Sequence, residues 1–192
     1  MGGAAIMPTL TLRPNSDVSV AMSQYGSGTG NYGRINESTT DDTNGVSTTN
    51  ILGAVDLYGL PDPSPSGTIN RVTVHFRARW AYNGITIVAP SYGTPQVRIG
   101  GTTYSGTQQA LTVIFASYNR SWTTNPNTKS AWTWQNINDL VAGIRLNAGT
   151  YGDDKNPTLG EAYCSQLWVV VDYNNEPVAN KLPAHLFFQG VR

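Results

Sequence analysis

The chain has 192 residues, a length that fits one β-rich domain. Charged residues make up 12% of it, and twelve basic residues cancel twelve acidic ones. A nucleic-acid partner is therefore not expected, because phosphate binding needs clustered Lys and Arg. No stretch approaches the ~20 apolar residues that span a membrane, so no membrane partner is expected either. The segment Met1–Pro8 lacks the basic and apolar regions of a secretory signal and is expected to be an N-terminal arm, residues 1–8.

The chain up to residue 80 predicts short strands separated by turns. Thr9–Arg13 alternates apolar and polar residues and stops at Pro14, and Asp41–Gly45 has the composition of a turn. The strongest signal runs from Ile69 to Trp80, where period-2 alternation predicts a half-buried antiparallel strand. Its apolar face contains Val72, Val74, Phe76, Ala78 and Trp80, and its polar face contains Thr73, His75, Arg77 and Arg79.

The middle of the chain predicts a hairpin and one further strand. Gln96–Ile99 is expected to pair with Thr102–Tyr104, because a Gly100-Gly101 dipeptide favours a two-residue hairpin loop. Ala110–Ala116 predicts the next strand, and Trp122–Thr128 predicts a turn around Asn125-Pro126.

The last third predicts a single short helix and a central strand. Thr133 can cap a helix over Trp134–Ala142, with Gly143 closing it at C′. A strand Ile144–Leu146 is expected to follow directly. The run Ala162–Tyr173 is apolar on both faces, which is typical of a strand between two layers.

The sequence therefore divides into the arm 1–8, a β-sandwich domain over 9–173 and a C-terminal extension over 174–192. The extension contains an apolar group, Leu186, Phe187 and Phe188, which is costly to leave in water. Three interpretations stay open: the group folds back on its own domain, it docks on a neighbouring subunit, or the extension is disordered. We take these three residues as the candidate partner-binding site.

Several motifs together resemble a jelly-roll-like β-sandwich domain of bacteriophage virion structural proteins, of the capsid-decoration or tail-associated kind. Those motifs are Leu12–Asn15, Asp56–Leu60, Gly67–Val74, Trp122–Pro126, Ala131–Trp134, Ile137–Leu140, Ala142–Leu146 and Ala162–Tyr173. The resemblance implies an all-β, antiparallel jelly-roll-type sandwich with one short α-helix, located in a virion. It implies a structural role, with a homo-oligomer and other capsid or tail proteins as partners, and no catalytic residues.

The reactive residues do not form an evident catalytic set, so no enzyme activity and no cofactor are expected. Cys164 lies in a strand-like run and is expected to be a small buried hydrophobe, while His75 and His185 are far apart in sequence. The pairs Asp41/Asp42 and Asp153/Asp154 could serve a hydrolase or bind calcium, but turn carboxylates usually accept local backbone hydrogen bonds.

The aromatic residues allow two interpretations. Three tryptophans and three tyrosines could form an exposed platform that stacks on sugar rings, or they could pack inside the domain. They are Trp122, Trp132, Trp134, Tyr104, Tyr118 and Tyr151. The expected function is thus a non-enzymatic virion component acting through subunit and lattice contacts; the alternative is a carbohydrate-binding attachment module of a tail or cell surface, with a glycan as partner.

Overall fold

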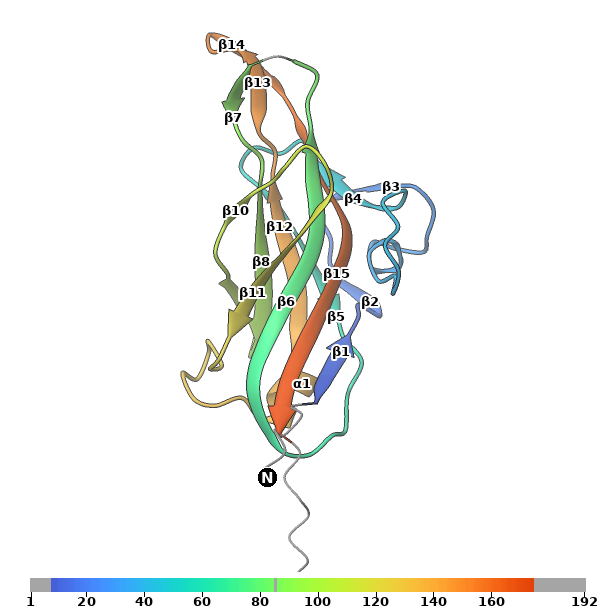
Figure 1. Cartoon of the computed structure of the whole chain (residues 1–192), viewed down its shortest axis with the longest axis vertical. Helices are drawn as coiled ribbons and strands as arrows, with labels where there is room; N and C mark the ends of the chain where they lie inside the picture. Colours follow the sequence, from blue (N-terminus) through green and yellow to red (C-terminus); the bar gives the residue numbers. More distant parts are fainter. Residues whose placement is uncertain (1–7, 85, 175–192) are drawn as a thin grey trace, which may run out of the picture.

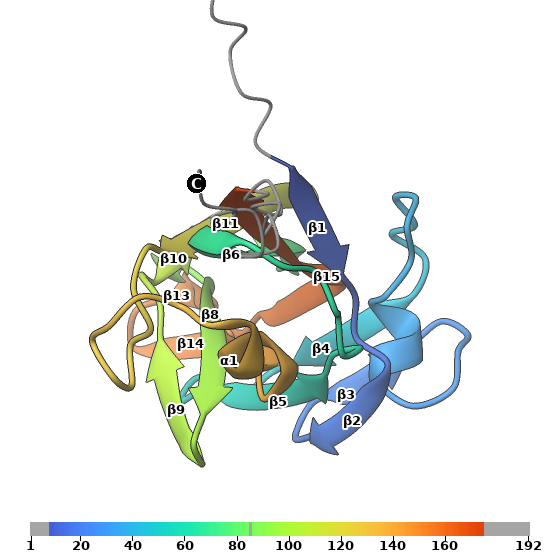
Figure 2. The ribbon, with the colours of Figure 1, turned by 90° about the horizontal axis from the view of Figure 1, so that it is seen from below.

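The computed structural model of the chain describes residues 8–84 and 86–174. Two six-stranded antiparallel sheets lie face to face, and a small three-stranded sheet extends one end of the molecule (Figure 1). Seen along the strands, the two layers enclose the interior (Figure 2). The expected all-β, antiparallel jelly-roll-type sandwich is confirmed.

Each sheet draws its strands from distant parts of the chain. The first sheet, sheet A, consists of β11 (Ala116–Trp122), β6 (Thr68–Ala81), β15 (Glu161–Asn174), β4 (Gly45–Thr48) and β3 (Ser23–Tyr25) in that order, with β1 (Thr9–Leu12) also paired to β15. Sheet B consists of β10 (Gln109–Ala110), β8 (Tyr92–Ile99), β12 (Val141–Asn147), β5 (Ala54–Gly59) and β2 (Ser16–Ser19), with β9 (Thr102–Ser105) paired to β8. Sheet C consists of β14 (Asn156–Leu159), β13 (Thr150–Asp153) and β7 (Ile87–Ala89).

The core lies between the inner faces of sheets A and B. The predicted apolar face of β6, which includes Val72, Phe76 and Trp80, is buried there. β15 is a central strand, because it pairs with β6 along one edge and with β1 and β4 along the other, which confirms the expectation for Ala162–Tyr173.

A short helix near one end of the sandwich has the predicted start but not the predicted end. The helix α1 covers Trp134–Asn138, and the Thr133 hydroxyl accepts a hydrogen bond from the Asn136 backbone N–H. The prediction that the helix reaches Ala142 is wrong, and so is the role of Gly143 as its cap, because Gly143 lies within β12. Asp139 ends the helix, and Leu140 is buried at the turn into the strand.

Two strand predictions need correction in the second half of the chain. The predicted strand Ala110–Ala116 is wrong: β10 ends at Ala110, and β11 begins only at Ala116. Residues 111–115 connect sheet B to sheet A, since β10 pairs with β8 and β11 pairs with β6. The hairpin formed by β13 and β14 was not predicted. The hairpin of β8 and β9 across Gly100-Gly101 was predicted and is confirmed. Both glycines have positive φ angles, as a two-residue hairpin loop requires.

The predictions for both ends of the chain concern residues that lie largely outside the described part of the structure. Leu186, Phe187 and Phe188 lie outside this part, as do His185 and nearly all of the predicted N-terminal arm and C-terminal extension. In the described part of the chain, no helix is long and apolar enough to cross a membrane.

Candidate functional site

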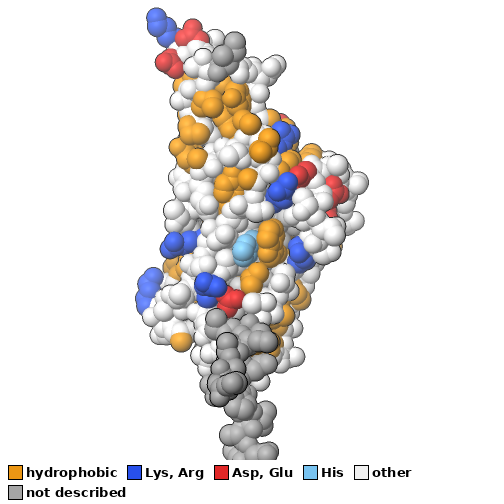
Figure 3. All heavy atoms as spheres, viewed as in Figure 1, with side chains coloured by type: hydrophobic (Ala, Val, Ile, Leu, Met, Phe, Trp, Pro, Cys, Tyr) orange, Lys and Arg blue, Asp and Glu red, His pale blue; other side chains and the backbone are white. Residues whose placement is uncertain are grey.

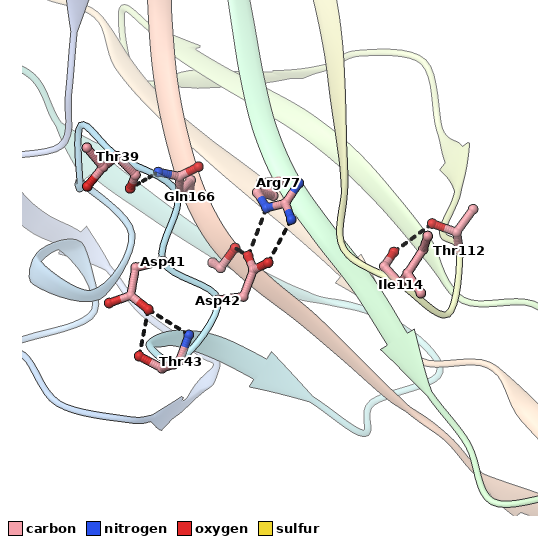
Figure 4. A network of polar contacts seen from close by, with 9 residues as sticks. Thr39, Asp41, Asp42, Thr43, Arg77, Thr112, Ile114 and Gln166 are labelled. Carbon is pink, nitrogen blue, oxygen red and sulfur yellow. Dashed lines mark hydrogen bonds and ion pairs between the residues drawn. The ribbon is translucent and has the colours of Figure 1, made fainter.

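Of the two predicted acidic pairs, Asp41/Asp42 is engaged in structural contacts within the domain, whereas Asp153/Asp154 is exposed and, among the described residues, Asp153 accepts only from the Lys155 backbone N–H. Asp41 accepts hydrogen bonds from the backbone and hydroxyl of Thr43, at 2.9 and 2.6 Å. Asp42 accepts from Nε and Nη2 of Arg77, at 2.8 and 2.7 Å, and from the Ser165 hydroxyl (Figure 4). These bonds from Arg77 hold the pKa of Asp42 below its usual value. Among the described residues, no group of three or more His, Cys, Asp or Glu side chains is placed to hold a metal ion.

Cys164 and His75 occupy structural positions on opposite faces of sheet A. Cys164 is fully buried, and burial raises the pKa of its thiol to about 12, which suppresses the nucleophilic thiolate. His75 stacks on Trp168 with ring centroids 4.9 Å apart and planes 7° apart. Its imidazole is half-buried, and desolvation lowers its pKa.

The six aromatic residues considered for a sugar platform are buried or half-buried, and five of them lie in the core or pack against it. Trp132 is buried, and Trp122, Trp134, Tyr104 and Tyr118 pack against the core. Tyr151 lies half-buried with its ring 5.7 Å from that of Tyr82, at a tilt of 48°. No flat exposed pair forms from this set, so the packing interpretation holds for these residues.

Side chains on the outer face of sheet A are largely matched to one another. Arg79 lies between the rings of Tyr163 and Phe115, at 4.6 and 5.1 Å from their centroids. Arg71 pairs with Asp172 on the neighbouring strand. Figure 3 shows this face, on which some charged side chains lie in small groups of opposite sign and others stand alone. A polar ligand would have to break these contacts in order to bind here.

The outer face of sheet B contains an open polar groove. Thr94 on β8 lies directly opposite Arg145 on β12, and Tyr92 lies opposite Asn147, so these four side chains share one face. The polar groove consists of two adjoining depressions, of about 260 and 370 Å³, and Gln108 and Asn147 line both of them. Its lining residues are Thr94, Ser105, Gly106, Gln108, Arg145, Asn147, Ile51, Ala89, Pro90, Tyr92, Ala148 and Thr150.

The polar groove changes character along its length. One half is lined by amide, hydroxyl and guanidinium groups from Gln108, Ser105 and Arg145. The other half adds the half-buried ring of Tyr92 and the exposed side chain of Ile51. A ligand lying along it would meet hydrogen-bonding groups at one end and an aromatic, partly apolar wall at the other.

A turn at residues 50–53 fixes the groove's polar side chains. The Asn147 amide donates to the Ile51 carbonyl over 3.1 Å, and Arg145 donates to the carbonyl of Leu52. A hydrogen bond from the Gly53 N–H to the Asn50 carbonyl closes the turn, and Gly53 has a φ angle of +95°. Two groove side chains are thus held in place before any ligand arrives, which lowers the entropic cost of binding.

Sequence reasoning missed this groove. The strand prediction Gln96–Ile99 covered only part of β8, and Ile144–Leu146 covered only part of β12. Period-2 alternation along the full strands is the signal that could have placed Tyr92, Thr94, Arg145 and Asn147 on one face. It could not have shown that β8 and β12 are neighbours, because Thr94 and its partner Arg145 lie 51 positions apart in the sequence.

Comparison of the whole domain with solved structures finds carbohydrate-binding modules. A family 16 carbohydrate-binding module-2 shares 8% identity over 79% of this chain and 86% of its own, with a TM-score of 0.40. The xylan-binding module CBM15 shares 9% over 88% and 99%, with a TM-score of 0.42. A CBM35 from Cellvibrio japonicus Abf62 shares 15% over 88% and 100%, with a TM-score of 0.34. No family model matches the sequence, and neither does any curated protein. At these scores the likeness carries no argument about a ligand.

Proposed function

We propose that this chain is a non-catalytic carbohydrate-binding module and that a glycan lies in the polar groove of sheet B. The observation that carries the proposal is the groove itself: amide, hydroxyl and guanidinium groups converge beside the Tyr92 ring. Binding sites for small ligands combine a few well-placed polar groups with an aromatic or apolar wall.

The chemistry of the lining residues suits sugar hydroxyls. An amide side chain such as that of Gln108 offers both donors and acceptors, and a hydroxyl such as that of Ser105 does the same. Each sugar hydroxyl also donates and accepts, so these groups can match it in either direction. The Tyr92 ring supplies an apolar face with a polar tip, which suits the C–H face of a pyranose ring.

The virion role expected from the sequence stays an untested expectation. None of the solved structures named above is a virion protein, and the residues expected to dock a partner lie outside the described chain. The carbohydrate-binding alternative is the better supported interpretation, because the groove provides it with a specific location.

Binding to a glycan array, followed by calorimetry with each hit, tests the proposal. Gln108 is exposed, lines both depressions and makes no hydrogen bond with another described side chain, so Gln108→Ala leaves the fold intact. We expect it to weaken glycan binding by about fivefold, since one hydrogen-bonding group is worth roughly 1 kcal/mol. The matched control is Asn119→Ala, which removes an exposed amide from β11 in sheet A. The proposal fails if no glycan binds, or if both variants bind like the original protein.

A further inference from the structure

The charge of the polar groove points to a narrower class of glycan. None of its lining residues is an Asp or Glu, whereas Arg145 contributes a full positive charge. Within the described part of the chain, ion pairs form at Arg71 and Arg77 only, so Arg145 has no carboxylate partner there. An exposed cation without a partner in the lining of a groove attracts an anion.

The guanidinium of Arg145 is both oriented and under-used. One of its N–H groups donates to the Leu52 carbonyl, and no other described residue accepts from it. Arg has five N–H donors in a planar fork that matches an oxyanion through two parallel hydrogen bonds. The turn at 50–53 sets the direction of the fork, and the remaining donors stay available to a ligand.

A second cation lies further along the same face. Arg98 is on the same side of β8 as Thr94 and four residues away, about 13 Å at the rise of a strand. It is half-buried and also lacks an ion pair within the described residues. Gln96 lies between Thr94 and Arg98 on β8, and its side-chain carbonyl accepts a hydrogen bond from the Ser105 hydroxyl over 2.9 Å. The outer face of β8 and β12 therefore carries two cations and several polar side chains, and no acidic residue lies among them.

We propose that the polar groove selects acidic glycans, whose oxyanion substituent, a uronate carboxylate or a sulfate ester, is bound by Arg145. This inference rests on the proposed carbohydrate-binding function and adds the ligand class. The polysaccharide chain would lie along β8 and β12, with Gln108, which lines both depressions, contacting its hydroxyls.

The test compares three kinds of polysaccharide on one array: uronate chains (polygalacturonate and alginate), a sulfated chain (carrageenan) and neutral chains (xylan and glucomannan). We expect an acidic chain to bind at least tenfold more tightly than every neutral chain, with an affinity that falls as salt is added. The uronate and sulfate arms identify which oxyanion is recognised. Polygalacturonate and its methyl ester then provide a matched pair that differs only in charge.

Variants locate the selectivity at one residue. Arg145→Gln should weaken binding of the acidic chain about tenfold or more, and should weaken binding of a neutral chain by a clearly smaller factor. Arg145→Lys keeps the charge but loses the planar fork, and should retain part of the selectivity. Lys155→Gln removes the same charge from the β13–β14 turn and should have no effect.

Three results separate the two proposals. If neutral chains bind as tightly as acidic ones, or if Arg145→Gln weakens both classes equally, the acidic-glycan inference is overturned while carbohydrate binding stands. If no polysaccharide of any class binds, the proposed function falls, and this inference falls with it.

Discussion

The Asn147 side chain donates a hydrogen bond to the Ile51 carbonyl, although 96 residues separate the two in sequence. Asn147 ends β12, and Ile51 lies in the turn before β5, which pairs with β12. The bond therefore ties a turn at the end of sheet B to the wall of the polar groove. This contact explains how a surface groove lined by flexible polar side chains can have a defined shape.

Gly53→Ala should disorganise the groove more than it unfolds the domain. Gly53 has φ of +95°, and a Cβ there would lie 2.4 Å from Nε of Arg145 and 2.8 Å from Nδ2 of Asn147. We expect a loss of about 1–2 kcal/mol of stability from the backbone conformation, together with a loss of glycan binding. Gly101→Ala is the matched control, because φ there is +83° and nothing lies within 4 Å of its Cβ. Urea unfolding and calorimetry should show similar destabilisation in both variants but weaker binding only in Gly53→Ala.

Asp56→Ala should be the most destabilising single change at a polar residue. This carboxylate is fully buried and accepts hydrogen bonds from the Ala21 and Met22 backbone N–H groups, from Asn31 and from the Tyr58 hydroxyl, at 2.6 to 3.0 Å. Removal of the carboxylate leaves these donors without it as an acceptor at a position closed to solvent, which should lower the free energy of unfolding by about 3 kcal/mol or more. Tyr58→Phe removes a single donor and should cost only about 1 kcal/mol. Equal unfolding midpoints for Asp56→Ala and the unmodified protein would contradict this role.

The Asp42–Arg77 contact should stabilise the domain in a pH-dependent way. The pKa of Asp42 is lowered in the folded state by the hydrogen bonds from Arg77, so the contact adds stability above the unfolded-state pKa of about 3.9. That contribution is lost as the pH falls through the lower, folded-state pKa. Asp42→Asn should therefore cost about 1 kcal/mol at neutral pH and progressively less in acid.

Urea titrations across this pH range, with Asp154→Asn as the control in the β13–β14 turn, check the prediction for Asp42. A difference between Asp42→Asn and the unmodified protein that stayed constant down to the most acidic pH would argue against it.

Cys164 should not react with a thiol reagent while the domain is folded. Its side chain is fully buried among apolar residues, and its thiol pKa is raised to about 12, so both access and thiolate are lacking. Mixing the native protein with an aromatic disulfide reagent should release no chromophore on the timescale in which the denatured protein reacts fully. Rapid labelling in the absence of denaturant would show that β15 opens readily.

The strands that alternate strongly could be predicted because their local pattern and their burial agree. β6 carries apolar residues at every second position, and its inner face is buried as expected. The strand prediction for Ala110–Ala116 was wrong, because a run of apolar residues is typical of a strand but does not by itself make one. Val113 and Ile114 are in fact exposed, on a connection that crosses between the sheets. Strand pairing is a property of the whole fold, and a short apolar run does not encode it.

The groove could not be predicted for the same reason. Thr94, Gln108 and Arg145 belong to three segments that only the sheet topology brings together. None of them stands out by residue type, whereas four of the five tryptophans, which do stand out, lie in the core or pack against it. The helix shows the opposite case: the Thr133 cap is a local hydrogen bond between near neighbours, so the sequence predicts its start correctly.

Nuclear magnetic resonance of the labelled protein, titrated with a bound glycan from the array, tests the location of binding most directly. Carbohydrate binding in the polar groove predicts that the largest shift changes occur at Thr94, Gln108, Arg145 and Asn147, while His75 and Trp168 on the outer face of sheet A stay unchanged. Shift changes centred on sheet A, or absent from β8 and β12, would contradict the account.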